Sequence, residues 1–321
     1  MNTKNERCLR VGTRASKMAC AQTEFFISEF LAKYPDYECE IVPITVSGER
    51  DYARPIAELG IEGVFVKELE EALLNKEVDF VVHSLKDLTT ELPSALSLAC
   101  VYNRIDPRDV LVSRNNVVFT DLPTGSRIAT SSRRRMAQLK TLRDDLTYMD
   151  IRGNVPTRIE KLDDGYCDAI VLAAAGLIRL GLEERITQFF DIEISLPIPG
   201  QGALGIECRT DDNVLKDKLN GMDDLDARTA VTAERSFLAT IGGGCSMPIG
   251  AYAKLIGSEK LLLTACVTSL DGKEVKKAEM EAPASEAKQL GERLAKVLLE
   301  QGAQKIVEQL RKLSPVVVSP P

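Results

Sequence analysis

Short apolar segments alternate with segments of helical periodicity through the first half of the chain, and this alternation constrains the fold more than any other feature. Residues 80–82 form a continuous apolar run, as in strands buried inside parallel sheets. Helical patterns follow several such segments, one beginning at Ser16 and another capped by Asn154. The alternation predicts an α/β fold with helices on both faces of a sheet. Strands are expected at 9–12, 40–46, 80–82, 127–129, 148–151 and 169–172.

Apolar spacing predicts which face of each helix packs against the sheet. Residues 65–73 show this pattern, with Val66, Leu69 and Leu73 on one side. The positions expected to face a core in two further helices are Met18, Ala21, Phe25 and Phe30 in the first helix, and Met136, Leu139 and Leu142 in the helix after residue 130.

The pattern changes in the second half of the chain. Residues 196–205, LPIPGQGALG, contain two prolines and three glycines, which is typical of a connection or hinge. Beyond residue 223, a helix at 227–238 precedes three strand-like runs and a long closing helix at about 286–313. The runs are at 250–256, 260–269 and 273–281. These elements predict a smaller α+β domain, and 321 residues suffice for two or three domains in all.

Charge, cysteine use and hydropathy restrict the class of protein. A net charge of -7 argues against a nucleic-acid binder, which usually carries a basic surplus. None of the eight cysteines forms a C-x-x-C pair, so the thiols are expected to be free in a reducing cytoplasm and no metal site is expected. The N-terminus lacks a signal-peptide core, and the longest apolar run, 169–178, is too short to cross a bilayer. The expectation is a cytoplasmic protein that binds neither membrane nor nucleic acid.

Arginines gather at the starts of three predicted helices. Residues 133–135 are all arginine and follow three hydroxyl residues, Arg152 and Arg158 flank the cap Asn154, and Arg14 precedes Ser16. A helix N-terminus carries about half a positive charge, so cations there are unfavourable unless an anion binds. One cluster alone would be interpreted as solvated surface arginines. Three clusters at the turns that line the ligand crevice of an α/β sheet favour an anion-binding site.

Lys86 and Asp87 follow the buried strand at 80–82 in the sequence HSLKD. A carboxylate at this edge of a sheet can stabilise a developing cation. The alternative is a surface ion pair of little energetic weight. His83, the single histidine, is interpreted as a buried structural residue and not as a catalyst.

Two glycine-rich segments are candidates for further roles. Gly200, Gly202 and Gly205 match G-x-G-x-x-G, but prolines precede them and a strand-like segment follows, so a dinucleotide site is disfavoured. Cys245 follows three glycines, which permit a tight turn close to another part of the molecule. Its thiol is either reactive or a small buried group on that turn.

Nine segments together form a specific pattern. They are GTRAS (12–16), GVFVKELEEALL (63–74), VHSLKD (82–87), DPRD (106–109), ATSSRRR (129–135), IRGNVPTR (151–158), DAIVLAAAGLIRLG (168–181), LPIPGQGALGIECR (196–209) and GGGCSMPIGAYA (242–253). In this order, the segments resemble the porphobilinogen deaminase family, also called hydroxymethylbilane synthases. The resemblance extends over nearly the whole chain.

The resemblance implies three domains. Two α/β domains, one of residues 1–102 with 202–220 and one of residues 107–197, would resemble type II periplasmic binding proteins. The chain would cross between them near 102–107 and 196–201. A small α+β domain of residues 224–316, with a three-stranded antiparallel sheet, would carry the cofactor on Cys245. A monomer is the family expectation.

The reaction implied by the resemblance is the head-to-tail condensation of four porphobilinogens with loss of ammonia, followed by hydrolytic release of hydroxymethylbilane in tetrapyrrole and haem biosynthesis. The implied cofactor is a dipyrromethane in thioether linkage to Cys245, and no metal is implied. Each pyrrole carries an acetate and a propionate, which arginine binds bidentately. Asp87 is the implied catalytic residue, because its carboxylate can accept the pyrrole N–H and stabilise the cation left when ammonia departs.

The resemblance assigns further binding residues by position. Those implied to hold the cofactor are Ser16, Lys86, Asp87, Thr130, Ser132, Arg134, Arg135 and Arg158, and those implied to hold the substrate are Arg14, Ser16, Arg152, Arg158, Arg179 and Gln201. The sequence departs from the family at residues 58–63, which read ELGIEG where lysines are frequent. Arg133 stands in place of a usual leucine, Thr89 stands where HSxKD is commonly followed by x-Pro, and Gly242 replaces a frequent glutamate.

Three other functions account for part of the sequence. A non-catalytic anion-binding protein on the same two-domain scaffold explains the arginines but not Cys245 or the third domain. A nucleotide-dependent enzyme that uses GQGALG is disfavoured by the flanking sequence. A nucleic-acid binder that uses residues 133–135 is disfavoured by the acidic net charge.

Overall fold

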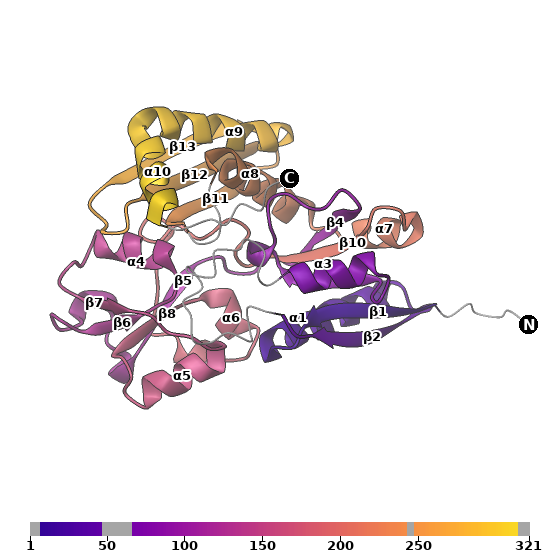
Figure 1. The fold of residues 1–321 in the computed structure, drawn as a ribbon, viewed down its shortest axis with the longest axis horizontal. Coiled ribbons are helices and arrows are strands. Elements are labelled where there is room, and N and C mark those ends of the chain that lie inside the picture. The colour runs from indigo at the N-terminus through magenta and orange to yellow at the C-terminus, as the bar shows by residue number, and fades with distance from the viewer. Residues whose placement is uncertain (1–6, 47–65, 243–246, 314–321) are drawn as a thin grey trace, which may run out of the picture.

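Three sheets form the framework of the chain in the computed structural model, which describes residues 7–46, 66–242 and 247–313 (Figure 1). In spatial order, the first sheet contains β2 (Tyr37–Ile44), β1 (Arg7–Arg14), β3 (Phe80–Ser84), β10 (Leu204–Arg209) and β4 (Leu96–Tyr102). The second contains β7 (Thr147–Met149), β6 (Arg127–Ala129), β8 (Ala169–Ala173), β5 (Asp109–Ser113) and β9 (Gln188–Phe189). The third contains β11 (Ile249–Ile256), β12 (Lys260–Thr268) and β13 (Val275–Pro283).

The first two sheets share one pattern of pairing. In the first, β1 pairs in parallel with β2 and β3, while β10 runs antiparallel to β3 and β4. In the second, β6 pairs in parallel with β7 and β8, while β5 runs antiparallel to β8 and β9. The antiparallel strand of each sheet therefore enters from the other sheet, along 103–108 before β5 and 190–203 before β10. The expected α/β architecture with two crossings is confirmed.

Helices cover both faces of each of these sheets. The helices of the described residues, those of the third layer included, are α1 (Lys17–Lys33), α3 (Lys67–Leu74), α4 (Arg133–Lys140), α5 (Val155–Asp163), α6 (Ala174–Ile178), α7 (Asn213–Asn220), α8 (Leu225–Ile241), α9 (Ala287–Leu298) and α10 (Gln304–Leu313). Alternate residues of β3 show the arrangement: Phe80 and Val82 pack with α1 and α7, while Val81 packs with α3. In the second sheet, α5 and α6 cover one face and α4 the other.

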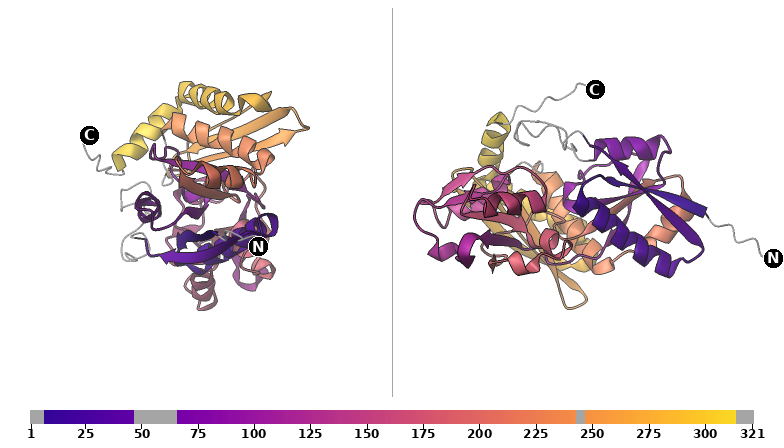
Figure 2. Two further views of the ribbon diagram at one scale, coloured as in Figure 1. Left: turned by 90° about the vertical axis from the view of Figure 1, so that its right-hand side faces the viewer. Right: turned by 90° about the horizontal axis from the view of Figure 1, so that it is seen from below.

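The third sheet is antiparallel and forms a separate α+β layer, as expected. Its core includes Phe237 of α8, Leu294 of α9 and Ile306 of α10. Figure 2 shows this layer at one end of the molecule, with its helices on one side of the sheet. The closing helix is interrupted between α9 and α10, where Gly302 has a φ of 100°. One continuous helix to residue 313 was therefore a wrong expectation.

Two predicted helix faces were only partly right: Phe30 and Leu139 are buried as expected, but Phe25 and Leu142 are not. In α1 the buried apolar residues include Phe26 and Phe30, whereas Phe25 is 38% exposed. Phe26 faces inward because its ring packs edge-on against Phe80, with centroids 5.9 Å apart. In α4 the buried side includes two arginines, and Leu142 lies beyond the helix and is 51% exposed.

Strand boundaries shifted by a few residues, and some elements gave no sequence signal. β2 covers Tyr37–Ile44 where 40–46 was expected, and β7 ends at Met149 where 151 was expected. The elements absent from the sequence-based assignment are β4, β5, β9, α6 and α7.

Candidate functional site

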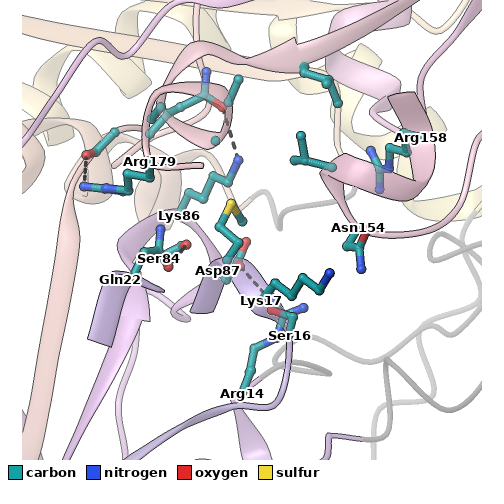
Figure 3. A pocket seen from close by; sticks show the side chains of 18 of the residues that line it. Arg14, Ser16, Lys17, Gln22, Ser84, Lys86, Asp87, Asn154, Arg158 and Arg179 are labelled. Carbon is teal, nitrogen blue, oxygen red and sulfur yellow. Dashed lines mark hydrogen bonds and ion pairs between the residues drawn. The ribbon is translucent and has the colours of Figure 1, made fainter. Parts of the chain in front are cut away.

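A cavity of about 480 Å³ lies where the ends of β1, β3 and β8 meet the starts of α1, α5 and α6 (Figure 3). The first and second sheets both contribute, and the crossing at 190–203 supplies one wall. Since these are turns from strand to helix or crossing segments, the cavity occupies the crevice expected for an α/β ligand site. The polar and charged side chains along it are Arg14, Ser16, Lys17, Gln22, Ser84, Lys86, Asp87, Arg135, Arg152, Asn154, Arg158, Arg179 and Gln201.

The charge of the lining is strongly positive. Its cations are Arg14, Lys17, Lys86, Arg135, Arg152, Arg158 and Arg179. Among the described lining residues, Asp87 is the one carboxylate. Seven cations around a single acid group in a partly closed space favour a ligand that carries several negative charges.

Asp87 is held at the edge of the first sheet by local structure. β3 ends at Ser84, and the 3-10 helix η2 (Leu85–Asp87) follows, which turns Asp87 toward the cavity (Figure 3). Its Oδ2 accepts a hydrogen bond from Arg14 Nη1 at 3.2 Å. Both side chains remain partly exposed, at 26% for Asp87 and 22% for Arg14. The carboxylate therefore lies beside a cation and is open to a ligand.

Lys86 lies next to Asp87 and has an altered acidity. Its Nζ donates to Gln201 Oε1 at 3.5 Å. Burial lowers the pKa of Lys86 to about 8, with Asp87 opposing the shift and Arg135 adding to it. Burial therefore destabilises the charged ammonium of Lys86, and the carboxylate of a ligand would stabilise it.

Asp109 holds Arg135 from behind the cavity. It is the first residue of β5 and is fully buried. Its carboxylate accepts from Arg134 Nη1 at 2.7 Å, Arg135 Nε at 2.8 Å and Gln201 Nε2 at 2.9 Å. Burial alone would raise the pKa of Asp109, but the two arginines hold it well below its usual range. The ionised carboxylate therefore orients Arg135 and Gln201, which line the cavity, while Arg134 does not.

The second sheet contributes Arg152 and Arg158 at the start of α5. Asn154 caps this helix by accepting from Thr157 N at 2.9 Å, and Arg158 Nε donates to Gly153 O at 2.8 Å. Burial, reinforced by Arg135, lowers the pKa of Arg158 to about 10. The cap and this hydrogen bond thus hold the Arg158 guanidinium where burial destabilises its charge. A bound anion would offset that destabilisation.

Arg179 connects the two crossings. It is the residue that follows α6, and its Nη2 donates to Asn103 O at 3.2 Å and Gly202 O at 2.9 Å. Burial lowers its pKa to about 10. Its contacts in the structure are therefore with the two chain crossings, at a place where it also borders the cavity.

The cavity brings together most of the residues predicted from the sequence. Those that line it are Arg14, Ser16, Lys86, Asp87, Arg135, Arg152, Arg158, Arg179 and Gln201. Thr130, Ser132 and Arg134 are not among the lining residues. Ser132 caps α4 by accepting from Arg135 N at 3.4 Å, and Thr130 Oγ1 accepts from Ser132 N at 3.2 Å. Cys245 and residues 58–63 lie outside the described residues.

Several residues of the site were missed by sequence reasoning. Lys17, Gln22, Ser84 and Asn154 also line the cavity. Gln22 is buried and accepts from Ser84 Oγ at 3.0 Å. A polar residue in a helical pattern normally indicates a solvent-exposed position, so the sequence did not indicate that Gln22 is buried at the cavity. Sequence reasoning also missed the role of Asp109, which binds Arg135 from behind the cavity. Its place at the end of the DPRD motif was the signal that could have indicated this role.

Two local expectations, a buried His83 and a strand at the end of GQGALG, are confirmed. His83 is buried, with Nε2 3.0 Å from Glu207 Oε2. Gly200 and Gly202 have positive φ in the turn before β10, and no helix follows them. A Cβ at Gly202 would collide with the carbonyl oxygen of Ile105, so the glycine allows the two crossings to touch.

Across 7–46, 66–242 and 247–313, no group of three His, Cys, Asp or Glu side chains is arranged to hold a metal ion. Over the same part of the chain, no helix combines the length and hydrophobicity of a bilayer-spanning segment.

The sequence and fold are similar to known proteins. Residues 9–217 match the family described as porphobilinogen deaminase, dipyromethane cofactor binding domain, and residues 228–300 match porphobilinogen deaminase, C-terminal domain. The chain is 45% identical over 304 residues to the porphobilinogen deaminase of Pelobacter propionicus, covering 95% of this chain and 97% of that protein. It is 46% identical to that of Geobacter metallireducens, covering 94% of each. The periplasmic VFT2 domain of Bordetella pertussis BvgS has a TM-score of 0.40 and 15% identity, covering 67% of this chain and 86% of that domain. Since the two family matches together span most of the chain, in order, the protein belongs to the porphobilinogen deaminase family.

Proposed function

We propose that the family's reaction takes place in this basic cavity, with Asp87 as the catalytic residue. The chain is a transferase, a hydroxymethylbilane synthase, which condenses porphobilinogen units head to tail in tetrapyrrole biosynthesis and uses a dipyrromethane cofactor. The observation that carries the proposal is the single carboxylate, Asp87, among seven cations that line one cavity of the described structure.

The lining cations suit the charge of the substrate. Each pyrrole brings an acetate and a propionate, so every condensation adds two negative charges. Arginine keeps its charge and binds carboxylates bidentately, whereas an uncharged lining would leave them without partners. We assign Arg14, Arg152, Arg158 and Arg179 to these carboxylates, with Ser16 as a hydroxyl donor and Gln201 beside the substrate ring.

The same lining fits a dipyrromethane, which carries four carboxylates. Lys86, Arg135, Arg158 and Ser16 are the residues that would hold it, together with Asp87 at its pyrrole N–H groups. When bound through Cys245, the cofactor supplies the free α-carbon to which the first substrate is joined. Thr130, Ser132 and Arg134 support this site indirectly in our proposal, because they cap α4 and bind Asp109, which orients Arg135.

Asp87 acts on the substrate in two ways. When the aminomethyl C–N bond of porphobilinogen breaks, ammonia leaves and a cationic azafulvene remains. The Asp87 carboxylate accepts a hydrogen bond from the pyrrole N–H and stabilises the positive charge of the azafulvene. A new C–C bond then forms at the carbon that lost ammonia, and the attacking ring must lose its α-proton. As the one carboxylate on the described lining, Asp87 is the base assigned to that proton, directly or through a bound water.

The remaining assignments concern the whole chain. We propose domain boundaries at 1–102 with 202–220, 107–197 and 224–316, which follow the two crossings and the start of α8. We further propose that the protein works as a monomer in the cytoplasm, with porphobilinogen as its small-molecule partner and without nucleic acid or membrane.

Intact-mass spectrometry and turnover test the proposal together. Protein from cells that make porphobilinogen should carry an adduct of two pyrrole units on Cys245, and an unmodified mass would contradict the cofactor assignment. Asp87→Ala should keep the adduct while its turnover falls by about 100-fold or more, the lower range for losing a general acid–base group. Asp163→Ala is the matched control, because this exposed aspartate pairs with Arg185 away from the cavity. Near-normal turnover of Asp87→Ala would remove Asp87 from the mechanism.

A further inference from the structure

Lys17 lines the cavity but has no role in the arrangement described so far. It is the first residue of α1, directly after the cap Ser16, whose Oγ accepts from Ala19 N at 3.3 Å. This cap holds the backbone at Lys17, while the long side chain remains exposed. In Figure 3 its chain leads away from Ser16 and extends in the direction of Asn154.

The other cations of the cavity are engaged by protein groups. Arg14 donates to Asp87, Arg135 to Asp109 and Arg158 to Gly153 O. Arg179 binds the carbonyl groups of both crossings. In contrast, no hydrogen bond or ion pair links the Lys17 ammonium to another described residue, so its three donors are open to a ligand.

The electrostatics at Lys17 also favour an anion. The first turn of α1 contains no acidic residue, so the cation adds to the partial positive charge of the helix end. Arg14 lies two residues before the cap Ser16 and adds a further positive charge to the same edge of the cavity. A carboxylate that reaches this edge would meet both charges.

We propose that Lys17 is a further substrate-binding residue, which holds an acetate or propionate carboxylate of the pyrrole substrate at the mouth of the cavity. The inference rests on the proposed function of the cavity and adds a residue to it. Because Lys17 belongs to the first α/β unit while Arg152 and Arg158 belong to the second, a substrate held by all three spans the crevice. Lys17 is exposed and forms no ion pair with Asp87 among the described residues, so we assign it to binding and not to bond breaking.

Steady-state kinetics with porphobilinogen separate these effects. Lys17→Met keeps the length of the side chain and its helix propensity but removes the charge. With the adduct on Cys245 verified by mass, we expect its KM to rise about three- to fivefold, in the range for a partly exposed ion pair, and its kcat to stay within about twofold. Lys17→Arg should restore KM. The rise in KM should shrink at high salt, because an exposed ion pair is screened.

Lys288→Met is the matched control, since Lys288 is an exposed lysine in the first turn of α9 and is not among the cavity residues. Equal KM values for Lys17→Met and Lys288→Met would overturn the inference while leaving the adduct and the Asp87 result intact. A fall in kcat with partial loss of the adduct, not rescued by Lys17→Arg, would also overturn it, because that pattern indicates a structural role. Failure of the proposed function itself would be seen differently, as an unmodified wild-type mass or normal turnover of Asp87→Ala.

Discussion

Lys86 shows how the environment of a single residue couples binding to pH. Its ammonium lies beside Asp87 and close to Arg135, in a place where burial lowers its pKa to about 8 from a usual 10.5. In the unliganded site, the Lys86 amine is mostly protonated at neutral pH and progressively loses its charge as the pH rises through about 8. Sequence reasoning identified Lys86 from HSLKD, but the direction of the shift depends on burial and on Arg135, which belongs to the other sheet.

The alkaline limb of the rate at which the apoprotein acquires its adduct should therefore report Lys86, which we assign to the cofactor carboxylates. We expect that rate to fall as pH rises through about 8, because the neutral amine no longer attracts carboxylates. In Lys86→Arg the charge persists, so that limb should move to higher pH even if the maximum is lower. An unchanged alkaline limb in Lys86→Arg would assign the titration to another group.

At the scale of elements, α4 shows a helix whose polar side is its buried side. Arg134 and Arg135 in its first turn both bind Asp109 of β5, and Arg134 Nη1 also donates to Leu196 O at 2.6 Å. The helix is thereby attached to β5 of the second sheet and to the second crossing. The apolar pattern of α4 could not predict this, because the attraction of a buried carboxylate outweighs the local amphipathic signal.

Arg134→Leu should destabilise the fold by about 3–5 kcal/mol, the range for removing one partner from a buried ion pair. The change leaves Asp109 with less positive charge in a buried site. Urea denaturation is the measurement, with Arg185→Leu as the control for an exposed arginine–aspartate pair. The control should lose less than about 1 kcal/mol. Equal losses in the two variants would show that Asp109 gains little from Arg134.

At the scale of the whole molecule, Glu234 of α8 connects the third layer to both crossings. Its fully buried carboxylate accepts from Arg104 Nη1 at 2.7 Å, Gly200 N at 2.8 Å and Ala253 N at 2.8 Å. These partners lie on the first crossing, the second crossing and β11. A single carboxylate thus joins all three parts of the chain at the two crossings.

Glu234→Gln should weaken the coupling between these parts. The amide keeps the size of the side chain but leaves the Arg104 guanidinium without its charge partner, at a cost of about 3 kcal/mol or more. Calorimetry should show a broader transition, or separate transitions, at lower temperature than in the wild type. Glu286→Gln is the control, because Glu286 forms an exposed pair with Arg293. A single sharp transition at the wild-type temperature would contradict this role for Glu234.

Much of the architecture could be predicted from the sequence because it depends on local rules. The cap at Asn154, the positive φ of Gly165 after α5 and the apolar run of β3 depend on residues within a few positions of each other. The arginines at strand-to-helix turns could also be placed at one crevice, because the turns of an α/β sheet meet at one edge. Short strands such as β9 were missed because two residues carry no periodicity.

The sequence by itself determined the alternation of elements, their caps and the family, since these are encoded by neighbouring residues and by motifs in order. The tertiary structure decided which of the predicted arginines line the cavity and which are buried behind it. Arg134 and Arg135 are neighbours with the same chemistry, yet only Arg135 is among the lining residues, while both bind Asp109 from a distant segment. The choice depends on a partner about 25 residues away and on burial, and no local pattern contains either.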